Sequence, residues 1–196
     1  MIRSLSEIDK EAFPLIDFFS ISTKGIQEST IEKNWLSVSN PTDEEKNRLR
    51  KDYNLPGNFF SLGEKYSNVS FFKKFQTEND TPLCLMLFVN IESIDEPESL
   101  SSTVTVFLTS DVLITVSKQS LMDEVLQSYQ SEIFTKAGLI LHLLQTINQH
   151  YLTFLKEQRK TIEEISQGTS NGSNKNILEL TTHTEKNLVY IDNLLN

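Results

Sequence analysis

The sequence predicts an α/β fold, in which a mixed β-sheet is flanked by helices and followed by long antiparallel C-terminal helices. Runs rich in β-branched and aromatic residues occupy much of the region from 71 to 116, which is typical of strands. From residue 120 onward, apolar residues recur at spacings of three and four, which is typical of amphipathic helices. We therefore expect a single domain, 1–196, with a mainly sheet part, 1–118, and a helical part, 119–196.

The first clear strand is Trp35–Val38, where bulky and small residues alternate as in a half-buried strand. Before it, the stretch to Thr30 mixes apolar and acidic residues without a clear period. Within that stretch we expect one short strand, Phe18–Ser22. The pair Asn40-Pro41 ends the strand that begins at Trp35.

A helix near 42–54 should follow, because Thr42 and Glu45 match a capping box. In such a box the hydroxyl and the carboxylate each bond a backbone N–H that the helix leaves unpaired. Leu49 and Tyr53 are then expected to face inward, and the Pro-Gly pair that follows ends or bends the helix.

Four further strands are expected from their β-branched and aromatic content. They are Phe71–Phe75, Leu83–Ile91, Val104–Leu108 and Val112–Val116. The last two form a hairpin around the polar turn Thr109-Ser110-Asp111. By the period of two, Val104, Val106 and Leu108 point to one face of the sheet. The acidic segment 95–102 is expected to be a loop between strands.

The helical part begins with a second capping-box match, Ser120 with Asp123. Apolar residues follow it at helical spacing, namely Met122, Val125, Leu126 and Tyr129. A longer helix, 139–165, is expected to end near Gly168. Its apolar positions are Ile140, Leu144, Ile147, Tyr151, Phe154, Leu155, Ile162 and Ile165.

Residues 168–176 are expected to form a flexible polar turn, since Gly and Asn tolerate positive φ. A final helix should start near Ile177 and reach Asn196 without a stop signal. Its apolar positions are Leu180, Leu188, Ile191, Leu194 and Leu195. We therefore expect the native chain to continue beyond Asn196.

The composition argues against several classes of partner. The net charge of -9 disfavours nucleic acid, because phosphate binding needs clustered Lys and Arg. The single cysteine, Cys84, lies within an apolar run, so we expect it to pack as a small, unreactive hydrophobe. We find no signal peptide and no apolar run of membrane length, and we expect the chain as given to be soluble.

No group of residues in the sequence indicates catalysis, so we do not expect an enzyme. The glycines are scattered and form no phosphate-binding loop. His142 and His150 lie on one predicted helix but about 80° apart around its axis, which is unfavourable for a shared metal. Satisfied or exposed histidines are the simpler interpretation. The acidic pairs Glu44-Glu45 and Glu163-Glu164 splay apart on helices and serve solubility.

In their order along the chain, these elements resemble the cytosolic half of the CorA family of divalent-cation transporters. The hairpin Val104–Val116 is the most specific part. The segment 139–165 resembles the first of that family's two long antiparallel helices. Leu178–Leu195, with Glu185-Lys186-Asn187-Leu188, resembles the start of the second.

The resemblance implies a cytosolic regulatory, cation-sensing domain of a homopentameric magnesium or cobalt channel, on the cytoplasmic side of the membrane. Mg²⁺ would be the transported or regulatory ion of the parent protein, with no tightly bound cofactor in this domain. The membrane would be reached only through segments that these 196 residues lack, among them the stalk helix and the Gly-Met-Asn signature of the pore.

The family's regulatory acids are not carried over to this chain. Their Glu-Asp pair falls on Ser61 and Leu62, and Glu64 is the nearest acid. We therefore assign no metal ligand and no catalytic or cofactor-binding residue. We expect a monomer or weak oligomer, stabilised little by divalent cations. The alternative function is a soluble interaction module, in which the C-terminal amphipathic helices bind a partner's helix; an enzyme of unknown type is the third hypothesis.

Overall fold

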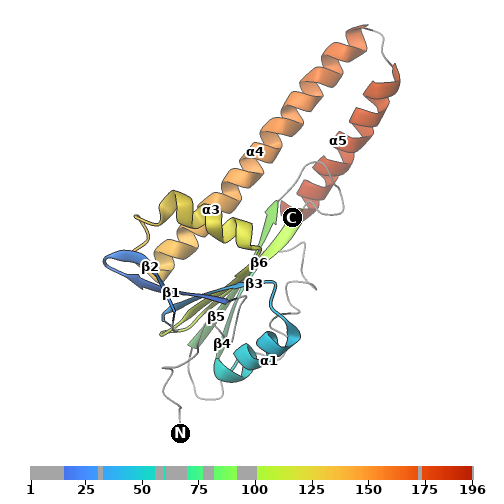
Figure 1. Cartoon of the computed structure of the whole chain (residues 1–196). Helices are drawn as coiled ribbons and strands as arrows, with labels where there is room; N and C mark the ends of the chain where they lie inside the picture. The colour runs from blue at the N-terminus through green and yellow to red at the C-terminus, as the bar shows by residue number, and fades with distance from the viewer. Residues whose placement is uncertain are drawn as a thin grey trace.

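The computed structural model describes residues 16–30, 33–55, 60, 70–76, 82–91, 101–171 and 174–195. Within them, a seven-stranded mixed sheet carries a short helix on one face and further helices on the other, which confirms the predicted α/β class. Two antiparallel helices, α4 (Lys136–Asn171) and α5 (Asn174–Leu195), extend far beyond the sheet (Figure 1). We call this pair the helical arm.

The sheet combines two antiparallel groups joined by one parallel pair. Its strands, in spatial order, are β2 (Gly25–Ser29), β1 (Ile16–Ser22), β3 (Trp35–Ser39), β7 (Leu113–Ser117), β6 (Ser101–Leu108), β5 (Pro82–Ile91) and β4 (Phe71–Gln76). The parallel pair is β3 with β7, in the middle of the sheet. The chain between β3 and β7 therefore passes from one antiparallel group of strands to the other.

Strand β3 is buried along its whole length, so the expectation of a half-buried strand was wrong. A strand at the centre of a sheet with helices over both faces has no exposed side. Even Ser37 and Ser39 are buried, at 2% and 7% exposure.

The hairpin of β1 and β2 was predicted only in its first half. Strand β1 contains the expected segment Phe18–Ser22, but β2 was missed because Gly25–Ser29 is short and mostly polar. Gly25 has φ of +94°, a conformation that favours glycine, at the start of β2. The side chain of Asn34, just before β3, binds this hairpin. Its Oδ1 accepts from the Ile21 N–H at 2.7 Å, and its Nδ2 donates to the Ile21 carbonyl oxygen at 2.8 Å.

The predicted hairpin of β6 and β7 is confirmed, with Leu108 opposite Leu113. Its turn is held by Thr109, whose hydroxyl oxygen accepts from the N–H groups of Asp111 and Val112 at 3.2 and 2.9 Å. Lys136 donates to the carbonyl oxygen of Ser110, and partial burial lowers the pKa of this lysine. Of the predicted loop 95–102, Ser101 and Ser102 belong to β6, and the rest lies outside the described residues.

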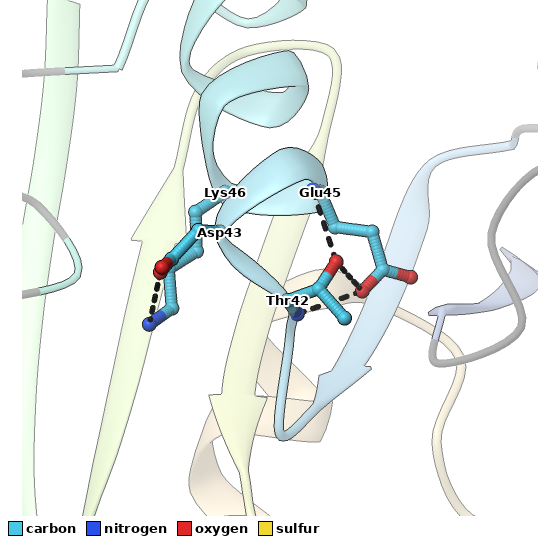
Figure 2. A network of polar contacts seen from close by, with 4 residues as sticks. All are labelled: Thr42, Asp43, Glu45 and Lys46. Carbon is cyan, nitrogen blue, oxygen red and sulfur yellow. Dashed lines mark hydrogen bonds and ion pairs between the residues drawn. The ribbon is translucent and has the colours of Figure 1, made fainter.

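Helix α1 (Asp43–Asp52) confirms the first capping box. The Thr42 N–H donates to Glu45 Oε2 at 2.8 Å, and the Glu45 N–H donates to Thr42 Oγ1 at 3.3 Å (Figure 2). Glu45 is buried in this arrangement while Glu44 is exposed, so the two acids do splay apart. The helix ends at Asp52 with Tyr53 as its C-cap, and Asn54 follows with φ of 51°, which asparagine tolerates better than most residues.

Helix α3 (Gln119–Tyr129) does not use the second predicted capping box. The N-cap is Lys118, two residues before the predicted cap Ser120, and no side-chain hydrogen bond caps the helix. Ser120 therefore lies inside the first turn, and Asp123 accepts instead from Gln119 Nε2 at 3.0 Å. The apolar face was predicted correctly, since Met122 and Val125 are buried.

The predicted flexible turn 168–176 was too wide. Helix α4 continues to Asn171 and α5 begins at Asn174, so the part of the turn outside the described residues is 172–173. A glycine inside a helix costs about 1 kcal/mol, which is too little to end a helix that the neighbouring residues favour. At the other end of α4, Thr135 Oγ1 accepts from the Gly138 N–H at 2.9 Å and caps the helix. This cap was not predicted from the sequence.

Two hydrophobic clusters hold these layers together, one on each face of the sheet. The first lies under α1 and includes Phe18, Leu36, Leu49, Leu87 and Phe107. The second lies under α3 and the first half of α4 and includes Trp35, Val106, Met122, Val125 and Leu143. Tyr151 of α4 packs against both clusters. The base of the arm is therefore part of the core, whereas its distal half lies beyond the sheet (Figure 1).

Candidate interaction site

The helical arm carries a stripe of exposed apolar side chains along α4. It consists of Leu141, Leu152, Leu155 and Ile162, which are 66%, 46%, 40% and 45% exposed. At about 100° per residue these four side chains fall within a sector of about 80° on one side of the helix. Leu155 and Ile162 are among the apolar positions predicted for this helix. The stripe instead flanks the buried side of α4, which carries Ile147 and Phe154.

Helix α5 also presents its apolar residues to solvent. Leu178, Leu180, Leu188 and Val189 are 69%, 42%, 38% and 61% exposed. Leu180 and Leu188, two of the apolar positions predicted for this helix, are therefore exposed on the arm. The side chains of Ile191, Leu194 and Leu195 lie outside what the structure describes.

Polar residues fill the seam between α4 and α5. Gln158, Thr184 and Asn187 are buried, at 3%, 4% and 0% exposure. Asn187 Nδ2 donates to Gln158 Oε1 at 3.5 Å and lies 3.3 Å from Nδ1 of His183. Asn187 Oδ1 and Thr184 Oγ1 have no hydrogen-bond partner among the described residues. Among the described side chains, polar residues thus lie buried between the two helices, while apolar and charged side chains share the outer surface of the arm.

The exposed apolar side chains of α4 and α5 mark the arm as a candidate interaction site. Contiguous exposed apolar surface rimmed by polar residues is typical of protein contact sites. Charged pairs lie within and beside the stripe: Arg159, which falls in the same sector as Leu141, pairs with Glu163 at 3.0 Å, and Lys160 lies 3.7 Å from Glu164. Glu163 and Glu164 form separate exposed i,i+4 pairs, which contribute little to stability.

The histidines lie apart from one another. The His142 ring stacks on Tyr129 with 4.4 Å between ring centroids, and its Nδ1 has no partner among the described residues. His150 contacts Asn90 and Glu124, a cluster of three elements that sequence reasoning missed. Residues 61 and 62, where the family register would place the regulatory acids, and the nearest acid, Glu64, lie outside the described residues. In the described ranges, no group of three or more His, Cys, Asp or Glu side chains is arranged to hold a metal ion.

The other features offer little chemistry. Cys84 is half-buried on β5, opposite Lys74 on one side and Leu108 on the other. A shallow, open hollow of about 400 Å³ lies between the turn of the first hairpin and the end of α3. Lys24 is its one charged lining residue, and no carboxylate or histidine faces it. Among the described helices, none is both long and apolar enough to cross a membrane.

The sequence matches the family of CorA-like Mg²⁺ transporter proteins over residues 32–196. The comparison with curated proteins gave no match.

Several solved structures share the fold. The soluble domain of CorA from Methanocaldococcus jannaschii has a TM-score of 0.65 at 16% identity, over 96% of this chain and 76% of that one. The complete CorA magnesium transporter from the same organism gives 0.64 at 16% identity, over 97% of this chain and 59% of that one. The ZntB cytoplasmic domain from Vibrio parahaemolyticus gives 0.61 at 12% identity, over 91% and 93%. At these identities the likeness establishes the fold alone.

Proposed function

The chain belongs to the family of CorA-like Mg²⁺ transporter proteins, and from this membership we propose that it forms the cytosolic regulatory domain of a divalent-metal-ion transporter. The family is one of transporters and not of enzymes. The chain spans 59% of the length of the complete magnesium transporter that it resembles. The transport activity therefore belongs to a longer protein, of which these residues are the part outside the membrane.

The exposed apolar stripe on α4 is the observation that supports this role. Four large apolar side chains lie along one side of a helix of 36 residues, about 54 Å long, that extends beyond the sheet. Such a surface is suited to pack against another helix of the assembled protein. In the proposed function the sheet part is a rigid base, and the arm transmits the position of this base to the remainder of the transporter.

The proposed ion is Mg²⁺, which the parent protein would transport or sense. The chain's net charge of -9 favours cations near its surface, and hard divalent ions prefer oxygen ligands. We assign no ligand within this domain, because the register places Ser61 and Leu62 at the family's acidic positions. Sensing would then depend on contacts between copies, in a homopentamer on the cytoplasmic side of the membrane.

The coding sequence beyond Asn196 provides the first test. Two apolar segments of membrane length with a Gly-Met-Asn tripeptide support the proposal, since about 20 apolar residues are needed for each span. A stop codon directly after Asn196 would exclude the transporter.

Ion flux provides the second test. The full-length protein, reconstituted in liposomes that contain a Mg²⁺-sensitive dye, should admit Mg²⁺ down its gradient, whereas protein-free liposomes should not. Charge-neutral stripe variants, Leu152→Ser and Leu155→Ser, should alter the response of that flux to Mg²⁺ on the cytosolic side. Absence of flux for Mg²⁺, Co²⁺, Ni²⁺ and Zn²⁺ would contradict the transport function.

The alternative function is a soluble helical interaction module, and the same stripe supports it. The two functions differ in what covers the stripe: the rest of the same transporter, or a separate protein. Absence of membrane segments in the full-length protein, together with binding of an amphipathic helix to α4, would favour the module.

A further inference from the structure

The seam between α4 and α5 follows a heptad pattern on both helices. Residues of the two rows are spaced alternately by three and four positions, as are the a and d residues that face the partner in a pair of packed helices. The row on α4 is Tyr151, Phe154, Gln158, Thr161 and Ile165, and the row on α5 includes Leu180, Thr184 and Asn187. Burial agrees with this assignment, because Phe154, Gln158, Thr184 and Asn187 are all buried.

The polar residues of the two rows lie opposite one another. Asn187 Nδ2 is 3.5 Å from Gln158 Oε1, and this contact defines the register of the pair. Counting from it in opposite directions along the two helices gives three matched layers, Gln158 with Asn187, Thr161 with Thr184, and Ile165 with Leu180. Polar layers therefore meet polar layers. Each amide carries both a donor and an acceptor, so the first layer can form whichever residue donates.

These polar layers do not serve stability. Thr184 Oγ1 and one polar atom of the Asn187 amide have no hydrogen-bond partner among the described residues. The Thr161 hydroxyl donates within its own helix, to the carbonyl oxygen of Glu157 at 3.1 Å. A buried polar atom without a partner destabilises a fold, whereas leucine at such positions carries no such penalty. The polar layers therefore need a reason other than stability.

The connection between the helices does not fix the register by itself. Gln158 and Asn187 are equally far along the chain from the connection 172–173. A slip of one heptad would move the middle of the connection to Thr169 or to Asn176. All three places fall within 168–176, where every residue except Lys175 is Gly, Ser, Thr or Asn, the types that favour turns.

We propose that the layers Gln158–Asn187 and Thr161–Thr184 determine the register of α5 along α4. A slip of one heptad sets Gln158 opposite Leu180 or Leu194, so its amide is buried without a polar partner. A buried asparagine determines the register of coiled coils in the same way. Because α5 returns from the tip of the arm towards the sheet, the register also sets where α5 ends (Figure 1). One heptad moves that end by about 10 Å.

Disulfide formation between pairs of introduced cysteines tests the register. Leu155 and Leu188 each follow a seam residue directly, and because the helices are antiparallel they lie on the same flank of the seam. The pair Leu155→Cys with Leu188→Cys therefore reports the observed register. The two slipped registers are reported by Leu155→Cys with Thr181→Cys and by Ile162→Cys with Leu188→Cys. All three pairs are made in the 196-residue chain with Cys84→Ala, which removes its one native thiol.

Under mild oxidation, the 155–188 pair should form its disulfide at least about tenfold faster than the other two, because a disulfide needs its Cα atoms within about 7 Å. Comparable rates for all three pairs would overturn the proposal, since the register would then not be fixed.

Three seam variants identify what fixes the register. Gln158→Leu with Asn187→Leu should bring the three rates within about threefold of one another, because the apolar rows no longer distinguish the registers. Gln158→Asn with Asn187→Gln is the matched control, which keeps an amide pair in the same layer and should retain the wild-type preference. Asn187→Leu with Leu180→Asn moves the asparagine by one heptad, and should make the 155–181 pair the fastest.

The relocated asparagine gives the sharpest outcome, because it predicts a new register and not merely the loss of one. If this variant and the double-leucine variant both keep the wild-type preference for the 155–188 pair, the connection fixes the register and the proposal is overturned. Circular dichroism establishes that each variant is folded. If the double-leucine variant is not, the relocated asparagine and the matched control decide, since both keep one amide on each helix.

Discussion

Trp35 donates its indole N–H to the hydroxyl oxygen of Thr115 at 3.0 Å, inside the sheet and away from water. The two residues are 80 positions apart and lie on the two parallel strands β3 and β7. Trp35 is fully buried and stacks on Phe19 of β1, with 4.4 Å between ring centroids. The Trp35 side chain therefore contacts both β1, through Phe19, and β7, through Thr115.

This bond predicts that Thr115→Val lowers the free energy of unfolding by about 1–3 kcal/mol, because the substitution leaves the buried indole N–H unpaired. Valine keeps the shape of threonine, so no cavity contributes. In a Trp35→Phe background, where the N–H is absent, the same change should have a smaller effect. Urea denaturation of the two single variants and the double variant measures the difference. Equal effects in both backgrounds would show that the bond does not stabilise the fold.

The capping box at α1 gives a second prediction. Thr42→Ala removes the acceptor of the Glu45 N–H and should destabilise the chain by about 1 kcal/mol. The matched control is Lys46→Ala in the same turn, which removes an exposed ion pair with Asp43 at 3.4 Å (Figure 2). The control should change stability by less than about 0.5 kcal/mol. If the two variants lose the same stability, the box has no special role.

The sheet part could be predicted from the sequence because its signals are local and agree with one another. The hairpin Val104–Val116 combines two β-rich runs with a turn that Thr109 can organise by itself. The parallel pairing of β3 with β7, in contrast, depends on a crossover between distant segments. No local pattern specifies which distant strands pair, so the sequence predicts a mixed sheet but not the order of its strands.

The arm could not be predicted in the same way, because apolar spacing reveals an amphipathic helix without revealing which neighbour covers it. Leu180 and Leu188 have helical spacing, yet Thr184 and Asn187 occupy the buried seam. The His150 cluster was missed for a related reason. Its members are separated by 26 and 60 positions along the chain, and only the packing of α3 and α4 on β5 brings them together.

The polar seam of the arm leads to a third prediction. Asn187→Ala alone should destabilise the chain by about 1–3 kcal/mol, because it leaves Gln158 buried without its donor. Replacing both residues by leucine should be neutral or stabilising, since no polar atom of that pair then remains buried. Thermal unfolding of the single and double variants measures this. A double variant less stable than Asn187→Ala would show that the seam contributes net stability.

The exposed stripe gives a fourth prediction, on association. Leu155→Glu and Ile162→Glu should change the stability of the monomer by less than about 1 kcal/mol, because both side chains are exposed on the surface of the arm. Phe154→Ala, at a position adjacent to the stripe but 2% exposed, should cost about 3–5 kcal/mol.

Light scattering should find the 196-residue chain monomeric or weakly oligomeric at micromolar concentration. Any weak self-association should disappear in the two stripe variants. A stable pentamer that these substitutions leave intact would place the contact between copies elsewhere on the chain.

The last prediction is that Mg²⁺ stabilises this chain little. A specific site needs several oxygen ligands that converge on one point. The sequence register offers Ser61 and Leu62 where the family has acids, with Glu64 nearby. Binding to the native state alone raises stability by RT ln(1 + [L]/Kd). A site with a Kd of about 0.1 mM would therefore add about 2.7 kcal/mol at about 10 mM Mg²⁺, a shift of several degrees in melting temperature.

Screening of a surface with net charge -9 should give a smaller shift, and sodium at the same ionic strength should reproduce it. Melting curves in MgCl₂ and in NaCl of matched ionic strength distinguish the two effects, because only a specific site discriminates between the cations. A shift of several degrees in Mg²⁺ that NaCl does not produce would mean that acids from separate segments form a site. Glu64→Ala would then show whether this residue belongs to it, since removal of a ligand should abolish the excess shift while leaving the screening effect unchanged.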